Sequence, residues 1–354
     1  MPILDRVPPA HVRRILVITG DHGTPDPTKA GGGYGEVDFD LHARMRTALE
    51  SLPGYEFEFL TDHGRLLPRL RHNPPEFVLN FCDTGLANDP SRELHVPALL
   101  EVFGIPYSGA GPAGMVLAYD KSVVRLVAEA EGIPVPREIY LHPDQDIPES
   151  PAAFPALLKP SRGDGSVGIT KDAVVRDAAQ AHACLADLRR LLPGAHVLVQ
   201  EYLPGAEYGL ALVGNPESGF TAFPPLEVDY SGLPEGLNPI LSFESKTMPE
   251  SPYWTDITFK PAKLPGEALA RMRRGAERLF ERLQCRDYAR FDFRTDAAGE
   301  IKLMEVNPNP AWDPEAKLAI MAGFAGKSYP DLLALLLDTA YARCEAAGLP
   351  ARNP

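Results

Sequence analysis

Cysteine is scarce in this sequence, and its spacing suits neither metal binding nor disulfide chemistry. The four cysteines lie far apart and form no CxxC pair and no Cys/His ligand cluster; they are Cys82, Cys184, Cys285 and Cys344. Such a distribution predicts buried free thiols in a reducing compartment.

Long hydrophobic runs and a positive face are missing as well. The longest apolar run near the end of the chain, Leu332–Leu337, is too short to span a bilayer and is typical of the buried face of a helix. Met1–Asp5 has neither the basic nor the hydrophobic part of a signal peptide. A net charge of −13 argues against nucleic acid or an anionic membrane as a partner. We expect a cytoplasmic protein that binds neither, although a few local lysines could hold a nucleotide.

Several common catalytic and cofactor motifs are absent too. No GxGxxG follows the first predicted strand, which argues against a NAD-type Rossmann enzyme, and no GKS/T sequence closes a phosphate loop. The histidines show no HExxH pattern and no paired metal-ligand spacing. No Ser/His/Asp or Cys/His arrangement can be recognised from order and spacing, although the members of a triad need not be close in sequence.

The chain has 354 residues, of which 44% are hydrophobic, and is long enough for two or three compact domains. Up to about residue 112, apolar strands alternate with helical patterns, which indicates an open α/β domain. The predicted strands of this domain are Arg14–Thr19, Glu56–Leu60 and Phe77–Phe81. Its predicted helices are Val37–Leu52 and Glu93–Val102.

Two further domains, 113–203 and 204–354, are predicted from the rest of the chain, which gives a mixed α/β (α+β) class. The second contains a helix opened by Asp120, a proline-rich surface loop at His142–Pro155 and, over Ala156–Leu203, a strand, a glycine loop, a strand, a helix and a strand. The third contains a long irregular stretch at Pro224–Lys263, a helix at Leu269–Leu283, a hairpin and a C-terminal helix.

The hairpin is the most informative segment. Its two strands alternate polar and apolar residues, and a turn centred on Ala298-Gly299 would place Asp292 opposite Glu305. The same register places Arg290 opposite Asn307, on the same face of the sheet. Two carboxylates and an amide oxygen beside an arginine suit Mg²⁺, which prefers hard oxygen ligands. An exposed hairpin with scattered charge explains this segment equally well when it is taken alone.

Two other segments could contact a nucleotide. Leu158–Gly168 is a strand ending in Lys159, a small-residue loop and a return strand, and such a loop can turn backbone N–H groups toward phosphate. Val197–Glu207 is an apolar strand that runs into a Pro-Gly turn, where backbone groups could pair with adenine and Glu207 could accept bonds from ribose. Taken alone, a flexible hairpin loop and a domain linker explain these segments at least as well.

Taken together and in this order, these segments resemble the ATP-grasp superfamily. The shared pieces are a lysine at a helix start, a lysine before a glycine loop, a Gln-Glu-Tyr-Leu-Pro-Gly-x-Glu turn, Lys246, and the hairpin motifs Arg290–Phe293 and Glu305–Pro310. Within the superfamily the chain is most similar to D-alanine–D-alanine ligase and its relatives, over nearly its whole length. The resemblance implies an ATP-grasp fold in which an N-terminal open α/β domain precedes two α+β domains that clamp ATP.

The resemblance also implies a role for each matching residue. The ATP phosphates would be contacted by Lys121, Lys159 and Lys246, the last of which lies on a mobile lid. Adenine would pair with the backbone of Glu201, Tyr202 and Leu203, beside Gln200. The ribose would bind Glu207. Two Mg²⁺ ions, or Mn²⁺ in their place, are implied with the ligands Asp292, Glu305 and Asn307, of which the glutamate bridges the ions. The implied catalytic residues are Arg290 beside the transferred phosphate, Lys246, and Ser166 of the glycine loop.

The implied reaction joins an acid to an amine. The carboxylate attacks the γ-phosphorus of ATP to give an acyl phosphate, the amine attacks the acyl phosphate, and ADP and phosphate are released. Positioning and electrostatic stabilisation supply most of such catalysis. Because water would destroy the intermediate, a lid has to close, and the Pro224–Lys263 region that carries Lys246 is the natural candidate.

The substrate side departs from the D-alanine ligases. Their small-residue loop after the metal asparagine is replaced by Pro308–Glu315, which contains Trp312, and Ala316 stands where they have a serine that binds the product carboxylate. Thr247 replaces the tyrosine of their lid, and Asn80–Gly85 replaces their His-Gly motif. We therefore expect small amino-acid-like substrates, but not D-alanine as both partners.

Two other functions are compatible with the sequence. An ATP-grasp enzyme could use an alcohol or a carrier protein as the acceptor, which the loss of the lid tyrosine leaves open. A nucleotide-binding regulatory module without turnover is a second alternative, although a sensor would have no need of Arg290 to stabilise an oxyanion. A homodimer is suggested by family analogy alone.

Overall fold

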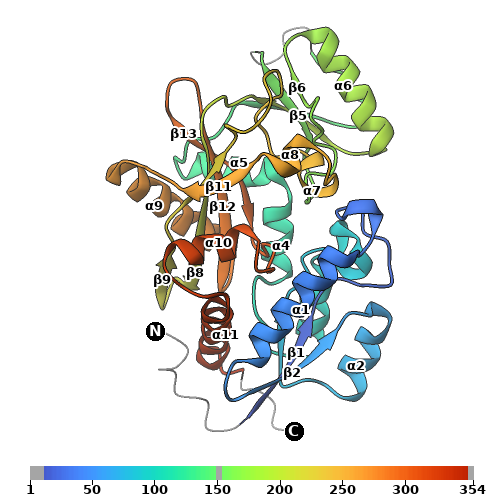
Figure 1. Cartoon of the computed structure of the whole chain (residues 1–354), viewed down its shortest axis with the longest axis vertical. Helices are drawn as coiled ribbons and strands as arrows, with labels where there is room; N and C mark the ends of the chain where they lie inside the picture. Colours follow the sequence, from blue (N-terminus) through green and yellow to red (C-terminus); the bar gives the residue numbers. More distant parts are fainter. Residues whose placement is uncertain (1–11, 149–153, 350–354) are drawn as a thin grey trace.

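The computed structural model describes residues 12–148 and 154–349 (Figure 1). The Met1–Asp5 segment lies outside the described residues, as does part of the predicted His142–Pro155 loop. The described chain forms three sheets, of three, four and six strands. Figure 1 shows α6 (Ala178–Leu191), the helix that accompanies the second sheet, toward one end of the molecule. It shows α2 (Leu66–His72), beside the first sheet, toward the other end.

The first sheet is parallel and belongs to the N-terminal part of the chain. β1 (Arg13–Ile18) lies in its centre, between β2 (Tyr55–Leu60) and β3 (Phe77–Asn80). Ile15 to Ile18 are at most 1% exposed, because a central parallel strand is covered on both faces. The helices here are α1 (Glu36–Glu50), α2 (Leu66–His72) and α3 (His95–Val102). This confirms the expected open α/β arrangement, although α2 was not predicted.

The second sheet is antiparallel, with the order β4-β7-β5-β6. Its elements are β4 (Glu138–Leu141), β5 (Ala156–Pro160), β6 (Val174–Val175), α6 (Ala178–Leu191) and β7 (Val197–Glu201). It is preceded by α4 (Pro112–Tyr119) and α5 (Lys121–Ala130), and between them Asp120 caps α5 by accepting a hydrogen bond from the Ser122 N–H. The sequence prediction missed β4, which has only four residues, and α4, which is almost entirely apolar.

The third sheet carries the hairpin and is antiparallel, with the order β11-β10-β8-β12-β13 and with β9 paired to β8. Its strands are β8 (Glu207–Asn215), β9 (Gly219–Ala222), β10 (Leu226–Asp229), β11 (Thr258–Pro261), β12 (Tyr288–Thr295) and β13 (Ile301–Asn307). One face packs against α9 (Gly266–Arg282). The other packs against α10 (Lys317–Phe324) and α11 (Tyr329–Ala346), and this core continues into the first sheet.

The Pro224–Lys263 stretch is not irregular, contrary to the sequence prediction. It contains β10 and β11, which pair with each other, and two short helices, α7 (Glu244–Thr247) and α8 (Pro252–Thr255). The strands give little sequence signal because they pair across a long insertion and β11 is largely exposed.

The cysteines are free thiols, and three of them are buried as predicted, but Cys184 is partly exposed. Within the described ranges no single helix is long and apolar enough to cross a membrane. α10 and α11 pass that test only as a pair, and they are bent by 105° relative to each other.

Candidate active site

The hairpin of β12 and β13 brings the four predicted side chains together. Asp292 pairs with Glu305, and Arg290 pairs with Asn307, as the sequence predicted. Residues paired across an antiparallel ladder share one face of the sheet. The two carboxylates, the amide and the guanidinium therefore lie side by side.

The register of the two strands nevertheless differs from the prediction between the turn and the site. Next to the turn, Thr295 pairs with Ile301, which centres the turn on Ala298 instead of the predicted Ala298-Gly299. That register alone would place Met304 opposite Asp292. A β-bulge takes up Met304 as an extra residue, and the predicted partners face each other beyond it.

Asp292 is nearly buried and is flanked by two cations. The Arg290 guanidinium donates to both carboxylate oxygens, at 2.9 and 3.1 Å from Nε and at 3.0 Å from Nη2. The Nζ atom of Lys317 lies 3.6 Å from the same carboxylate. Burial lowers the pKa of Arg290, but the carboxylates of Asp292, Glu305 and Asp164 together raise it. The arginine thus stays charged in the interior.

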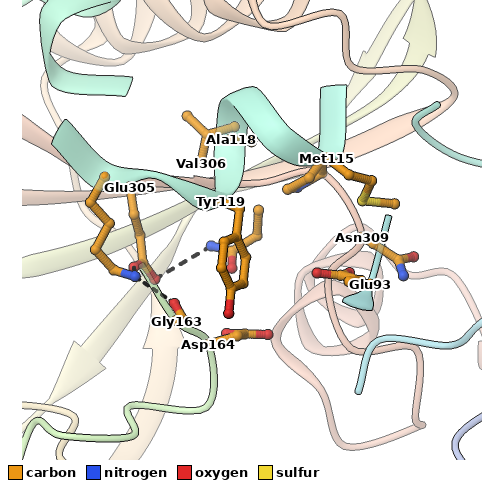
Figure 2. A pocket seen from close by; sticks show the side chains of 12 residues that line it. Glu93, Met115, Ala118, Tyr119, Gly163, Asp164, Glu305, Val306 and Asn309 are labelled. Atoms are coloured by element: carbon orange, nitrogen blue, oxygen red, sulfur yellow. Dashed lines mark hydrogen bonds and ion pairs between the residues drawn. The ribbon is translucent and has the colours of Figure 1, made fainter. Parts of the chain in front are cut away.

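Several charged and polar side chains surround the Glu305 carboxylate (Figure 2). Its carboxylate lies 3.8 Å from the Nζ atom of Lys121 and accepts a hydrogen bond of 3.4 Å from the Asn307 amide. Burial alone would raise the pKa of Glu305, yet the pKa is lowered because Lys121, Lys159 and Arg290 stabilise the carboxylate. The negative charge is thus held in place by surrounding cations.

Two lysines approach Glu305 from different elements. Lys121 opens α5, and its Nζ atom donates to the Gly163 carbonyl at 2.6 Å. Lys159 lies near the end of β5 and is 4% exposed. Burial and the charge of Lys121 lower the pKa of Lys159 to about 8. An anion bound beside both lysines would relieve their repulsion, as expected at a phosphate site.

The glycine loop after β5 is tied to the predicted lid. Ser166 has a φ of 58°, and its hydroxyl donates to the Leu241 carbonyl at 3.0 Å. The Phe243 N–H donates to the Ile169 carbonyl at 2.8 Å. Lys246 lies on α7 with its side chain exposed, and partial desolvation by the surrounding protein lowers its pKa. The lid thus rests on the glycine loop, and the Ser166 hydroxyl contacts the lid.

The predicted adenine-binding segment follows β7. Gln200 is buried and donates to Glu138 at 2.9 Å, while the Glu201 carboxylate lies 3.2 Å from the Lys302 ammonium. No described residue accepts a hydrogen bond from the Leu203 N–H. Both side chains are therefore occupied, whereas one backbone donor is open to a ligand.

The predicted ribose ligand, Glu207, opens β8 and is 4% exposed. The guanidinium of Arg294, which stands directly opposite on β12, lies 3.1 Å from its carboxylate. The Tyr202 ring lies beside this pair, with its centroid 5.3 Å from the guanidinium. The predicted adenine and ribose residues thus adjoin one another.

Comparison with known proteins decides the family. Residues 132–338 match the family model described as the D-ala D-ala ligase C-terminus. The chain belongs to the D-alanine–D-alanine ligase family. Members of this family are ATP-dependent ligases that form a C–N bond, so the enzyme class and the ATP-grasp fold expected from the sequence are confirmed.

Similar ligases align with most of the chain. It is 31% identical to the D-alanine–D-alanine ligase of Oleidesulfovibrio alaskensis, over 92% of this chain and 96% of that one. An uncharacterized protein of Sinorhizobium fredii is 30% identical over 81% of this chain and 83% of its own. The D-alanine–D-alanine ligase of Bacillus anthracis, crystallised with ATP, has a TM-score of 0.71 at 21% identity; the match covers 95% of this chain and all of that one and shows the shared fold.

The three candidate metal ligands fit the hard cation that this ligase family requires. Within the part of the chain that the structure describes, no three His, Cys, Asp or Glu side chains are grouped to hold a metal ion. The hairpin instead offers the two carboxylates of Asp292 and Glu305 and the amide of Asn307. Such a set of hard oxygen donors suits Mg²⁺, which keeps water and phosphate oxygens in its shell and needs few protein ligands.

A pocket with acidic walls opens beside this motif (Figure 2). It encloses about 400 Å³ of space, including open solvent at its mouth, and its lining includes Glu93, Tyr119, Lys121, Asp164, Glu305, Asn307 and Asn309. Burial and the charge of Asp164 raise the pKa of Glu93 well above its usual range. Burial also raises the pKa of the nearby Asp83 to about 7, against the opposing charge of Lys29.

Two cations at the site were missed by the sequence prediction. Arg294 follows Asp292 by two residues on β12, so the alternation of the strand could have placed it on the same face. Lys317 opens α10 and adjoins Ala316, but only the fold brings it to Asp292. A lysine that follows a loop and opens a helix carries no such signal.

Proposed function

We propose that this chain is an ATP-dependent carboxylate–amine ligase that works through an acyl phosphate and releases ADP and phosphate. The observation that carries the proposal is the convergence of Asp292, Glu305 and Asn307 with a surrounding set of cations, in a chain of the D-alanine–D-alanine ligase family. The cations are Lys121, Lys159, Arg290 and, on the lid, Lys246.

ATP binds between the second and third sheets. Lys121 and Lys159 hold its phosphates, because both lysines adjoin the glycine loop in the sequence or by contact and their charges reach the proposed metal ligand Glu305. Glu207 accepts bonds from the ribose hydroxyls, and the backbone of Glu201–Leu203 pairs with adenine. Lys246 covers the phosphates, and Ser166 holds the lid above them through its bond to the Leu241 carbonyl.

The metal ligands are the three oxygen-bearing side chains of the hairpin. Asp292, Glu305 and Asn307 would hold the divalent metal, as two Mg²⁺ ions or Mn²⁺ in their place. When bound, the ions offset the negative charge on the phosphoryl oxygens. Arg290 orients the Asp292 carboxylate from the protein side.

The chemistry follows from these positions. An oxygen of the substrate carboxylate attacks the γ-phosphorus, the bond to the ADP oxygen breaks, and an acyl phosphate forms. The amine then attacks the acyl carbon, Arg290 stabilises the oxyanion, and phosphate leaves. The closed lid keeps water from the intermediate.

The substrates are amino-acid-like, but they are not two D-alanines. Ala316 has no hydroxyl for a product carboxylate, and the Thr247 hydroxyl donates to the Phe243 carbonyl of its own helix at 2.9 Å. The acidic wall formed by Glu93 and Asp164 adds negative charge to the pocket. These features support substrates whose recognition differs from that of the D-alanine ligases.

We also propose the surrounding organisation of the molecule. It has three domains, at 1–112, 113–203 and 204–354, and acts in the cytoplasm on small molecules, without nucleic-acid or membrane partners. A homodimer is proposed by analogy with the family.

Phosphate release from Mg-ATP tests the proposed function. The purified protein is assayed against pairs of D- and L-amino acids and against simple carboxylates, with Asp292→Asn as the blank and with mass detection of products. Phosphate release that needs both an acid and an amine, and that is lost in the variant, supports ligation. An ester or a modified carrier protein in the mass spectrum would point to another acceptor. ATP binding without turnover in any mixture would favour a regulatory module.

A further inference from the structure

We propose that Arg294 positions Glu207 for the ribose and fastens the lid, at Pro239, to the nucleotide site, so that sugar recognition and lid position depend on one side chain. The inference rests on the proposed binding of ATP. It assigns a positioning role to a residue that the ATP motifs of the sequence did not include.

The ion pair leaves one glutamate oxygen for a ligand. Arg294 and Glu207 are directly paired on β12 and β8, and each is 4% exposed. Arg294 Nη1 donates to Glu207 Oε2 at 3.1 Å, and the Tyr230 hydroxyl donates to the same oxygen at 2.7 Å. No described residue donates to Oε1. A buried carboxylate is costly unless it is paired, so Arg294 both compensates the charge of Glu207 and fixes which of its oxygens is left free.

Glu207 also acts electrostatically on the proposed phosphate site. Burial and Lys121 lower the pKa of Lys159, whereas the charges of Glu305 and Glu207 raise it, so this lysine lies in the electrostatic field of both the metal motif and the proposed ribose ligand. A nucleotide whose phosphates contact Lys159 therefore has its sugar near Glu207.

The same guanidinium holds the part of the lid that precedes α7. Arg294 Nη2 donates to the Pro239 carbonyl at 2.6 Å, just before the lid contacts the glycine loop through Leu241 and Phe243. The contacts of Leu241 and Phe243 are made with Ser166 and Ile169 of the glycine loop, which belongs to the second sheet. Arg294 comes from β12, the strand that also carries the proposed metal and oxyanion residues. It therefore links the lid to the hairpin sheet.

Aromatic rings fix the guanidinium in this position. The centroids of Tyr202 and Tyr230 lie 5.3 and 5.5 Å from its central carbon, within the range of a cation–π contact. Its Nε atom is buried and has no hydrogen-bond partner among the described residues. A lysine could keep the charge but not this set of contacts, because it lacks the planar fork.

The test compares the binding of ADP with that of 2′,3′-dideoxyADP, both with Mg²⁺, by isothermal titration calorimetry. The wild type is expected to bind ADP about tenfold or more tightly, because hydrogen bonds to a charged group are strong. In Arg294→Met this preference falls to near one. Tyr230→Phe keeps the guanidinium and retains most of the preference. Arg273→Met removes an arginine from an exposed ion pair on α9 and is expected to change neither nucleotide's affinity.

Arg294→Lys separates the two roles and guards against a methionine variant that does not fold. The lysine keeps a charge beside Glu207 but loses the bond to Pro239. Its ADP preference is expected to stay within about threefold of the wild type, while hydrogen exchange across residues 239–247 of the ADP complex rises at least tenfold.

The possible failures are distinguishable. An Arg294→Met protein that keeps the wild-type preference for ADP, or an Arg294→Lys protein whose lid exchanges like that of the wild type, would overturn the inference alone. A wild type that binds ADP but does not prefer it to 2′,3′-dideoxyADP would also remove the ribose contact proposed for Glu207. A wild type that binds no ADP at all would remove the proposed ATP binding and the inference together.

Discussion

The ammonium of Lys317 lies 3.6 Å from the carboxylate of Asp292, although the whole loop after the metal motif separates the two residues in sequence. Both side chains are largely shielded from solvent, at 15% and 4% exposed. A cation in this position competes with a metal ion for the same oxygen atoms. The relationship connects the substituted loop of this chain to its proposed metal chemistry.

Removing Lys317 is therefore expected to strengthen metal binding. Lys317→Met should lower the Mg²⁺ concentration needed for half-maximal nucleotide binding about fivefold, since a partly buried ion pair contributes roughly 1 kcal/mol. The measurement is an Mg²⁺ titration of the ADP-dependent shift in melting temperature. Lys317→Arg keeps the charge and serves as the control. An unchanged Mg²⁺ requirement in the methionine variant would refute the competition.

Arg290 should matter for turnover more than for nucleotide binding. In Arg290→Lys, kcat is expected to fall about 100-fold or more, as when a donor to a developing oxyanion is lost. The affinity for ADP should change by less than about threefold, because the oxyanion forms only when the amine attacks the acyl carbon and is absent from the ADP complex. Steady-state kinetics and calorimetry check the two values. If ADP affinity fell as far as kcat, Arg290 would be a nucleotide ligand and not an oxyanion donor.

The pKa of Lys159 predicts a loss of phosphate affinity in mild alkali. Burial and Lys121 lower this pKa from 10.5 to about 8, so the free protein loses the charge as the pH rises through about 8. ADP binding should weaken over that range, and Lys159→Arg, which stays protonated, should bind ADP with little dependence on pH. Calorimetry between about pH 7 and pH 9 measures both. The same decline in the arginine variant would assign the effect to another group.

Stability without nucleotide should depend on the protonation of Asp83. Its pKa is raised from 3.8 to about 7, so between these values the folded state holds a proton that the unfolded state has released. The stability associated with this proton is fully present below the unfolded pKa and is lost as the pH rises through about 7. Asp83→Asn should therefore raise the melting temperature by a few degrees at about pH 8 and change it little near pH 4. Equal shifts at both values would contradict the assignment.

The metal motif could be predicted from the sequence because its geometry is local. Alternation along two strands and a short turn were enough to place Asp292 opposite Glu305. The register was nevertheless incomplete, since the shifted turn and the bulge at Met304 offset each other at the site. A bulge adds one residue without changing the polar pattern beyond it, so spacing alone could not reveal it.

The residues that were missed depend on contacts between distant segments. Lys317 reaches Asp292 from α10, and the bond of Arg294 to Pro239 requires the lid to fold back over the sheet. β10 and β11 lay within a stretch predicted to be irregular, because β10 pairs with β8 and β11 pairs with β10 across a long insertion, which their own periodicity does not show. Such contacts follow from tertiary packing, which sequence periodicity does not encode.

Oxygen transfer tests the central claim, formation of an acyl phosphate, most directly. The acid substrate found in the phosphate-release panel is labelled with ¹⁸O in its carboxylate and incubated with Mg-ATP and the amine. Attack of the carboxylate on the γ-phosphorus predicts that each phosphate released carries one ¹⁸O atom, and that Asp292→Asn forms none. Released phosphate that carries no ¹⁸O would contradict the account.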